Sequence, residues 1–299
     1  MTAPDPIAYI QRTRRYYQAL GYGPPYEWAR HKAVAFSPLP RALSGCRIAI
    51  VTTAAPFQPD KGDQGPGAPY NATAKFYQVY AGSTDTIADL RISHLAIDRM
   101  HTSARDIGTY FPLKALKAAE ASNRIGAVAP AFFGLPTNRS QRTTRDVDAP
   151  DLVARCLTDK VDAAILVPNC PVCHQSVSLA AGALERAGIA TVIMGCAKDI
   201  VEHAGVPRFL FSDFPLGNSA GIPHDFPSQE RTLGLALSLL EQATGPRTTW
   251  QSPLVWPGPA DWRDDYSSID ALSPAEIAEK RAAFDAGKAQ AKAIRSGGI

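Results

Sequence analysis

Short apolar runs alternate with segments of helical periodicity over most of this 299-residue chain. The apolar runs are typical of strands buried on both faces, and they predict strands at residues 47–53, 90–96, 125–130, 162–167, 189–194 and 208–212. Apolar positions at helical spacing predict helices at residues 112–121, 148–158, 172–187 and 227–242. This alternation predicts an α/β fold, Rossmann- or flavodoxin-like, with helices on both faces of a largely parallel sheet.

The pattern weakens toward both ends, and this suggests a division of the chain. We place the α/β catalytic core at residues 46–244, as one large core or two lobes, after an N-terminal helical extension at residues 1–45. Residues 245–299 are predicted to form a Pro/Trp-rich linker and a C-terminal helix. We expect that helix to serve as a packing or dimer arm, and the protein to be a homo-oligomer. A Gly/Pro-rich loop at residues 56–72 is predicted to be a lid or an insertion.

The composition is ordinary for a globular protein, with 45% hydrophobic and 20% charged residues. A formal net charge of +3 gives no reason to expect a nucleic-acid partner. No apolar run approaches the roughly 20 residues of a membrane helix, and the N-terminus lacks an apolar signal core. We therefore expect a cytoplasmic protein with no membrane partner, whose five cysteines are mostly free thiols.

The most distinctive chemistry is the stretch Cys170-Pro171-Val172-Cys173-His174, at the predicted junction of a buried strand and a helix. Free amide groups and the dipole at a helix start favour a thiolate, so Cys170 is expected to ionise more easily than an ordinary cysteine. Pro171 suits the first helical position, which needs no backbone donor. A second thiol three residues later can close a disulfide or release a covalent intermediate. The stretch therefore predicts an enzyme that performs thiol chemistry on a small molecule.

Ligands of open α/β sheets bind at the carboxyl ends of the strands, so the residues after each predicted strand are candidates for one site. We predict four catalytic residues: Cys170, Cys173, His174 and His94. Substrate contacts are predicted for Asp98, Phe133 and Cys196, and for the turn of Pro215, Leu216 and Gly217. Backbone groups of that turn are expected to face a carboxylate or carbonyl of the substrate.

Three alternatives stay open at this point. Cys170, Cys173 and His174 fit a zinc site that is completed by Cys196, His94 or His224, and this would give a hydrolase or lyase. The chain also fits a non-catalytic subunit of a reductase complex, in which the cysteines only accept electrons. Finally, a single Cys-x-x-Cys pair can be structural, and His94 can be a core residue. Apart from zinc, we expect no resident cofactor.

Four stretches between about Leu90 and Asp225 resemble the selenoprotein B group of glycine, sarcosine, betaine and D-proline reductases. In the first, His94 follows Ile92-Ser93 and precedes Leu95 and Asp98. The others are Phe111-Pro112-Leu113 with Arg124-Ile125-Gly126 and Ala129-Pro130, the Cys170–Cys173 pair, and Pro207-Arg208 with Phe214-Pro215-Leu216-Gly217 and Gly221-x-Pro223-x-Asp225. Cys170 occupies the place of the family's selenocysteine.

The resemblance implies reductive cleavage of a carbon–heteroatom bond in amino-acid metabolism. Cys170 would be the nucleophile and Cys173 the resolving thiol, and the resulting disulfide would be reduced by a thiol reductant such as a thioredoxin-like protein. In the family, a pyruvoyl group on a partner subunit activates amino-acid substrates. Cysteine is a weaker nucleophile than selenocysteine, so His174 or His94 is expected to assist by handling protons.

Overall fold

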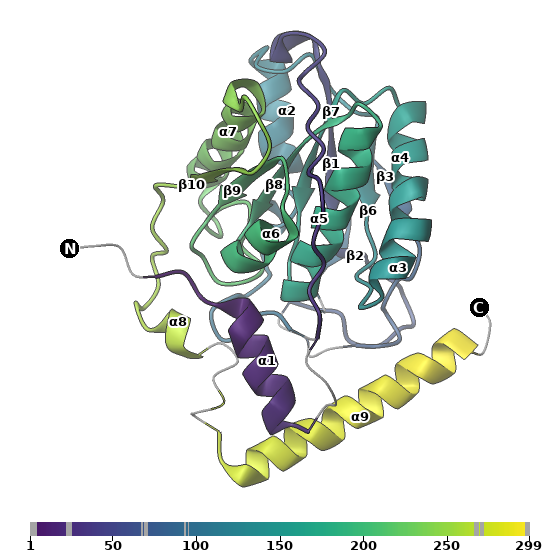
Figure 1. Cartoon of the computed structure of the whole chain (residues 1–299), viewed down its shortest axis with the longest axis vertical. Helices are drawn as coiled ribbons and strands as arrows, with labels where there is room; N and C mark the ends of the chain where they lie inside the picture. The colour runs from purple at the N-terminus through teal and green to yellow at the C-terminus, as the bar shows by residue number, and fades with distance from the viewer. Residues whose placement is uncertain are drawn as a thin grey trace.

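A computed structural model describes residues 5–21, 26–66, 68, 71–92, 94, 96–265, 269 and 272–296. Its centre is an eight-stranded sheet (Figure 1). The order of strands across it is β10 (Thr248–Gln251), β9 (Arg208–Phe211), β8 (Ala190–Gly195), β7 (Ala163–Val167), β1 (Arg47–Thr52), β6 (Ala131–Gly134) and β3 (Tyr80–Ser83). The short β5 (Ala127–Val128) pairs with the start of β1. Only β3 runs antiparallel to its neighbour, so the predicted α/β fold with a largely parallel sheet is confirmed.

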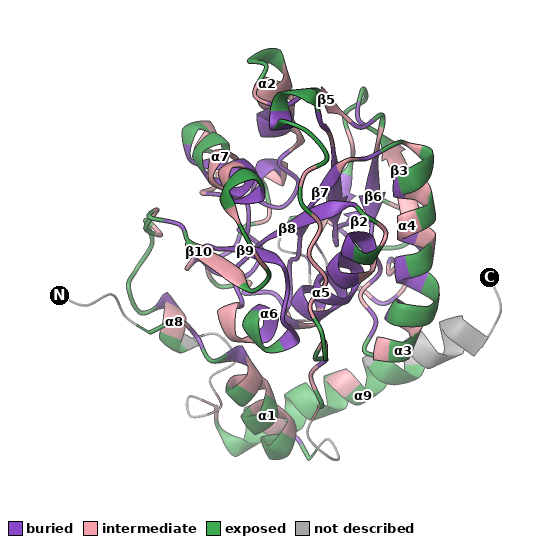
Figure 2. Ribbon diagram, turned by 45° about the horizontal axis from the view of Figure 1, so that its top comes forward, coloured by how far each residue is buried: buried purple, intermediate pink, exposed green. Residues whose placement is uncertain are grey.

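Helices cover both faces of this sheet because its central strands alternate apolar side chains between two cores. Ile48 and Ile50 of β1 face a core that includes α2 (Leu113–Ala121) and α7 (Phe226–Gln242). Ala49 and Val51 face the opposite core. That core includes α4 (Ala149–Thr158), α5 (Pro171–Arg186) and α6 (Lys198–Ala204). Figure 2 shows the resulting band of buried strands between two helical layers.

The strand order reverses direction at β1. From β1 the chain builds β6 and β3 on one side, and it then returns to place β7, β8, β9 and β10 on the other side. The loops that leave the carboxyl ends of β1 and β7 therefore diverge, and this topological switch point is where open α/β sheets bind ligands. The two loops are also linked, because the backbone N–H of Asn169 donates to Oγ1 of Thr53 at 3.1 Å. The Cys-x-x-Cys pair begins at the next residue.

The sheet differs from the predicted strands at its edges. In the segment predicted as a strand at residues 90–96, only β4 (Leu90–Arg91) forms. It pairs with β2 (Ala55–Pro56) in a separate two-stranded ladder, while Ser93 and Leu95 lie outside the described residues. Residues 125–130 contribute β5, and the chain resumes as β6 after Pro130, which has no N–H to donate. The edge strands β3 and β10 were not predicted, and β10 carries the sheet beyond residue 244.

The N-terminal extension contains the helix α1 (Tyr9–Ala19). Residues 26–42, which we name the strap, run largely without regular structure along α5 (Figure 1). The strap is anchored by Ala29 N–H to Oε1 of Gln175 at 2.8 Å and by Ser37 N–H to Oε2 of Glu185 at 2.5 Å. Glu185 also forms a buried ion pair with Arg208 at 3.0 Å.

Short helical turns and the C-terminal helices complete the fold. The turns are η1 (Leu43–Gly45), η2 (Ile107–Thr109), α3 (Gln141–Thr143) and the π-helical η3 (Thr144–Asp148). After β10 come α8 (Trp262–Asp265) and the predicted C-terminal helix, α9 (Pro274–Ser296), which lies with α1 below the core in Figure 1. None of the helices in the described ranges has the length and hydropathy needed to cross a bilayer.

Candidate functional site

Cys170 occupies the N-cap of α5, as the sequence predicts. β7 ends at Val167, Pro171 begins the helix, and Cys170 itself has extended backbone angles. Its Sγ accepts a hydrogen bond from the backbone N–H of Cys173 at 3.2 Å. This is the position in which a side-chain acceptor satisfies one of the free amides at a helix start. Both thiols are buried, with Cys170 4% exposed and Cys173 fully enclosed.

A histidine completes a group with the two thiols. One ligand atom each from His94, Cys170 and Cys173 lies within 4.8 Å of the others. His94 comes from the segment that follows β4, so its position depends on the packing of a loop on the start of α5. On another side, Oγ1 of Thr137, from the loop after β6, lies 3.2 Å from Sγ of Cys173. Within the described residues, Nδ1 of His94 is buried and has no hydrogen-bond partner.

The two thiols titrate as a pair that shares a proton. Burial opposes ionisation of both, and it raises the pKa of Cys170 well above the ordinary value. Burial also acts on Cys173, but hydrogen bonds from Cys170, His94 and Thr137 outweigh it and hold the pKa of Cys173 well below that value. Lys75, three residues after the Gly/Pro-rich loop, lowers the pKa of Cys170 but does not outweigh burial. The resting negative charge therefore lies on Cys173 and not on Cys170, because Cys173 accepts more hydrogen bonds.

His174 is directed away from the thiols by its own hydrogen bonds. Its Nδ1 lies 2.8 Å from the backbone oxygen of Cys170, so Nδ1 carries the proton and donates. Its Nε2 accepts from the backbone N–H groups of Cys196 at 2.9 Å and Ala197 at 3.1 Å. Burial lowers the pKa of His174 to about 4, which keeps the ring neutral. Both ring nitrogens are engaged with backbone groups, so His174 links the start of α5 to the loop after β8.

Gly195 makes room for this link. A Cβ at residue 195 would lie 2.8 Å from Nε2 of His174, closer than real Cβ contacts allow. A glycine at the end of β8 is therefore required for the ring to reach the two backbone amides.

Cys196 and Phe133 lie near the carboxyl edge but outside the thiol–histidine group. Sγ of Cys196 lies 3.7 Å from Oγ of Ser219, and burial raises the pKa of Cys196 to about 12. Phe133 packs into the core beneath α4 and α5, where it is 2% exposed. No described contact joins either side chain to Cys170 or Cys173.

The predicted turn at Pro215, Leu216 and Gly217 has its carbonyls bonded internally. The carbonyl of Pro215 accepts from the side chain of Asn218 at 3.1 Å. Those of Leu216 and Gly217 accept from the hydroxyl groups of Thr102 at 3.0 Å and of Thr109 at 3.2 Å. Gly217 has a φ of 107°, which only glycine adopts readily. These bonds fix the turn against the segment around Thr102.

Asp98 does not present a free carboxylate, because it is paired with His101. Its carboxyl group lies 3.0 Å from Nδ1 of His101. Burial raises the pKa of Asp98, and the neighbouring His101 lowers it by a smaller amount. The pair fixes the segment between His94 and the Pro215–Gly217 turn.

An aromatic cluster that the sequence did not predict lies beside the thiols. The guanidinium of Arg139 lies over the rings of Tyr17 of α1 at 4.7 Å, Tyr26 of the strap at 5.7 Å and Phe284 of α9 at 5.9 Å. Burial, and to a smaller extent the nearby Cys170, raise the pKa values of both tyrosines. We name these four residues the clamp. It brings both terminal extensions to the start of α5.

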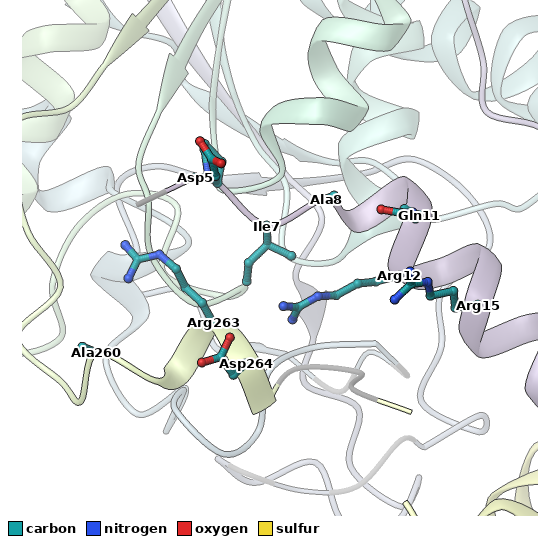
Figure 3. Close-up of a pocket in the computed structure, with 10 residues that line it drawn as sticks. Asp5, Ile7, Ala8, Gln11, Arg12, Arg15, Ala260, Arg263 and Asp264 are labelled. Atoms are coloured by element: carbon teal, nitrogen blue, oxygen red, sulfur yellow. The ribbon is translucent and has the colours of Figure 1, made fainter. Parts of the chain in front are cut away.

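A cavity of about 500 Å³ lies elsewhere, between the start of α1 and α8. Figure 3 shows Arg12 and Arg263 projecting into it. The guanidinium of Arg263 is bonded to the carboxylate of Asp213 at 2.5 Å. None of the residues that line this cavity belongs to the thiol–histidine group.

Fold and site together define a doubly wound α/β protein with a buried dithiol–histidine group at the switch point of its sheet. The chain is similar to subunit gamma of D-proline reductase from Acetoanaerobium sticklandii. The two are 25% identical over 200 residues, which cover 66% of this chain and 79% of the relative. A scan against family models finds no match, and a search of solved structures finds none either.

Proposed function

We propose that the chain is a thiol-dependent subunit of the reductase class, in which Cys170 attacks a small polar substrate and cleaves a C–N or C–S bond. The observation that carries this proposal is the proton-sharing pair of Cys170 and Cys173 at a helix start, beside His94. Similarity to a D-proline reductase subunit supports the same reaction class. It also supports placement with the selenoprotein B group, with Cys170 at the selenocysteine position.

The pair supplies both a nucleophile and an acid. As the sulfur of Cys170 bonds to the substrate carbon, its proton passes to the thiolate of Cys173, which lies within hydrogen-bonding reach. The bond from carbon to nitrogen or sulfur then breaks, and the leaving group takes the electron pair together with that proton. Cys173 is a thiolate again and is ready for the second step.

The second step releases the product. The thiolate of Cys173 attacks the sulfur of Cys170, a disulfide forms, and the substrate carbon departs with the electron pair of the S–C bond. That carbon gains a proton from solvent, by way of His94. The substrate has then gained two electrons and two protons, and the dithiol has become a disulfide.

The cycle requires partners. A thiol reductant, such as a thioredoxin-like protein, must return two electrons to the disulfide. We further propose that the chain works beside another subunit, as the D-proline reductase subunit does by its name. A pyruvoyl group on that subunit would activate an amino-acid substrate. A non-catalytic role, with the thiols only accepting electrons, predicts that the assembled complex forms no covalent adduct between Cys170 and the substrate.

A second candidate rests on the same three side chains. Sγ of Cys170, Sγ of Cys173 and the imidazole of His94 fit the three-ligand pattern of a catalytic zinc site. Zinc bound there would activate a water molecule at the fourth position. Two other ligands of the predicted zinc site are less suited. His174, predicted as one of its first three ligands, has both nitrogens bonded to backbone groups, and Cys196, predicted as a fourth ligand, contacts Ser219.

The decisive experiment is intact-mass analysis of purified protein with a limiting alkylating reagent across pH, beside a metal assay. The thiol reading predicts no stoichiometric metal and selective modification of Cys170. The midpoint should lie well below about 8.5, the ordinary thiol pKa, because the Cys173 thiolate takes up the proton of Cys170 as the new bond forms. One equivalent of zinc, with both thiols protected until a chelator is added, would instead establish the metal site.

A further inference from the structure

Asn169, the residue before Cys170, has an amide that the protein leaves unsatisfied. The residue is fully buried, and neither its Oδ1 nor its Nδ2 has a hydrogen-bond partner within the described part of the chain. Its backbone is nevertheless fixed, because its N–H donates to Oγ1 of Thr53 at 3.1 Å. The residue is therefore held at the switch point, where the loop after β7 is bonded to the loop after β1.

Two other polar side chains on the same edge, Asn218 and Ser219, are satisfied. The amide of Asn218 donates to Oγ1 of Thr102 at 2.8 Å and to the carbonyl of Pro215 at 3.1 Å. The hydroxyl of Ser219 donates to the carbonyl of Pro168 at 2.7 Å. Buried polar atoms without partners are rare in folded proteins because desolvating them costs free energy. Asn169 is thus suited to a ligand, whereas Asn218 is suited to holding the fold.

The chemistry of the amide limits which ligand satisfies it. An asparagine side chain offers two N–H donors and one acceptor oxygen. A lone carboxylate satisfies only the donors and places negative charge near Oδ1. The edge of an amide, open or cyclic, presents a carbonyl and an N–H side by side, and it pairs with both atoms of Asn169 at once.

We propose that Asn169 is a specificity-determining residue, which pairs with an amide edge on the substrate beside the carbon that Cys170 attacks. This inference deepens the proposed function and rests on it. The substrate class is a small molecule whose reactive carbon is adjacent to an uncharged amide. Asn169 orients that carbon toward the sulfur and rejects analogues with a carboxylate in its place.

Two alkylating reagents test this directly, because each carries its reactive carbon beside one of the two groups. Iodoacetamide presents a carboxamide and iodoacetate a carboxylate. In each reaction the Cys170 sulfur forms the S–C bond and iodide departs. The measurement is the rate of Cys170 modification by each reagent, located by peptide mass and divided by the rate with glutathione. For the wild-type protein we expect a normalised preference for iodoacetamide of about tenfold or more, as two hydrogen bonds would give.

The variant Asn169→Leu should reduce that preference by about tenfold, to near the ratio set by charge alone. Its melting temperature should equal or exceed that of the wild type, since an unpaired buried amide has been removed. The control Asn218→Leu removes a bonded amide, so its melting temperature should fall while the preference stays. If Asn169→Leu fails to fold, Asn169→Ser removes the amide with a smaller side chain and is read in the same way.

The outcomes separate this inference from the proposed function. A preference that is the same in the wild type and in Asn169→Leu overturns the role of Asn169. A large loss of stability in Asn169→Leu, with the preference retained, shows a structural asparagine and also overturns it. If Cys170 reacts with neither reagent in the native protein, the nucleophile itself is wrong, and the proposed function fails first.

Discussion

Two neighbouring strand-to-helix junctions each place a buried cysteine at the carboxyl edge of the sheet, but only Cys170 is grouped with a second thiol and a histidine among the described residues. Cys170, after β7, and Cys196, after β8, are 4% and 3% exposed. Cys170 directly precedes α5, and its sulfur shares a proton with Cys173. Cys196 lies two residues before α6, and its backbone N–H is taken by His174. Position on the edge is therefore not enough, because a thiolate also needs hydrogen-bond donors that outweigh burial.

The largest difference between the two junctions is expected in turnover and alkylation rates when each sulfur is removed in turn. Cys170→Ser should lower turnover and alkylation at residue 170 by at least about 1000-fold, because a hydroxyl in this position is a far weaker nucleophile. Cys196→Ser should change either rate by less than about threefold, since burial keeps the pKa of Cys196 at about 12. Similar losses in the two variants would show that both junctions take part in the chemistry.

Replacing His174, which links the two junctions, should change the free energy of unfolding in a pH-dependent way. His174 has a pKa of about 4 in the folded protein and about 6.5 when unfolded, so the unfolded state binds the extra proton between these values. Its contribution is present above about pH 6.5 and is lost as the pH falls toward 4, by on the order of 3 kcal/mol. Urea unfolding of wild type and His174→Gln across this range measures it.

In that experiment His174→Gln should be less stable than the wild type at pH 7, because its side chain replaces a ring that bonds to three backbone groups. The difference between the two proteins should narrow as the pH falls, because only the wild type loses the contribution of the neutral ring. A constant difference from pH 7 to 4 would mean that His174 is not held neutral by the fold.

A smaller change should follow from replacing His94. The imidazole of His94 is one of the groups that lower the pKa of Cys173, so His94→Ala should move the midpoint of the alkylation profile upward by about one pH unit. The rate at pH 6.5 should then fall about tenfold. A matched change at the other histidine of the segment, His101→Ala, should leave the midpoint in place. An unchanged profile in His94→Ala would remove His94 from the site.

The smallest effect is expected from removing the hydroxyl groups that lie beside Cys173 and Cys196. Thr137→Val removes an oxygen 3.2 Å from Sγ of Cys173 and should raise the same midpoint by a few tenths of a pH unit. Ser219→Ala removes an oxygen 3.7 Å from Sγ of Cys196 and should leave the profile of the thiol pair unchanged. Equal shifts in both variants would mean that the junctions are electrostatically coupled.

The central fold was predictable from the sequence because its strands are continuous apolar runs. β1, β7 and β8 are buried over nearly their whole length, and sequence pattern predicted each within a residue or two. The edge strands β3 and β10 are only half-buried or exposed, and their mixed composition gives no such signal. Residues 90–96 have the apolar character of a core strand, but among the described residues of this segment only Leu90 and Arg91 form a ladder.

The site was predictable at the level of elements and less so at the level of side chains. Cys170 at a helix start follows from local sequence, since Pro171 marks the first turn. The different orientations of His94 and His174 do not, because they depend on how a distant loop and the end of β8 pack against α5. The clamp was equally hidden: Tyr17, Tyr26, Arg139 and Phe284 come from four segments that only the tertiary fold brings together.

The strap also has a consequence for the order in which the protein is built. Ser37 bonds to Glu185 and to Arg208, which follow it by 148 and 171 positions. During synthesis the strap leaves the ribosome first, yet it has nowhere to dock until α5 and β9 have been made. The clamp closes later still, because Phe284 belongs to α9. Cys170 and Cys173 therefore leave the ribosome more than 100 residues ahead of Phe284, and the clamp beside them closes only after α9 has been made.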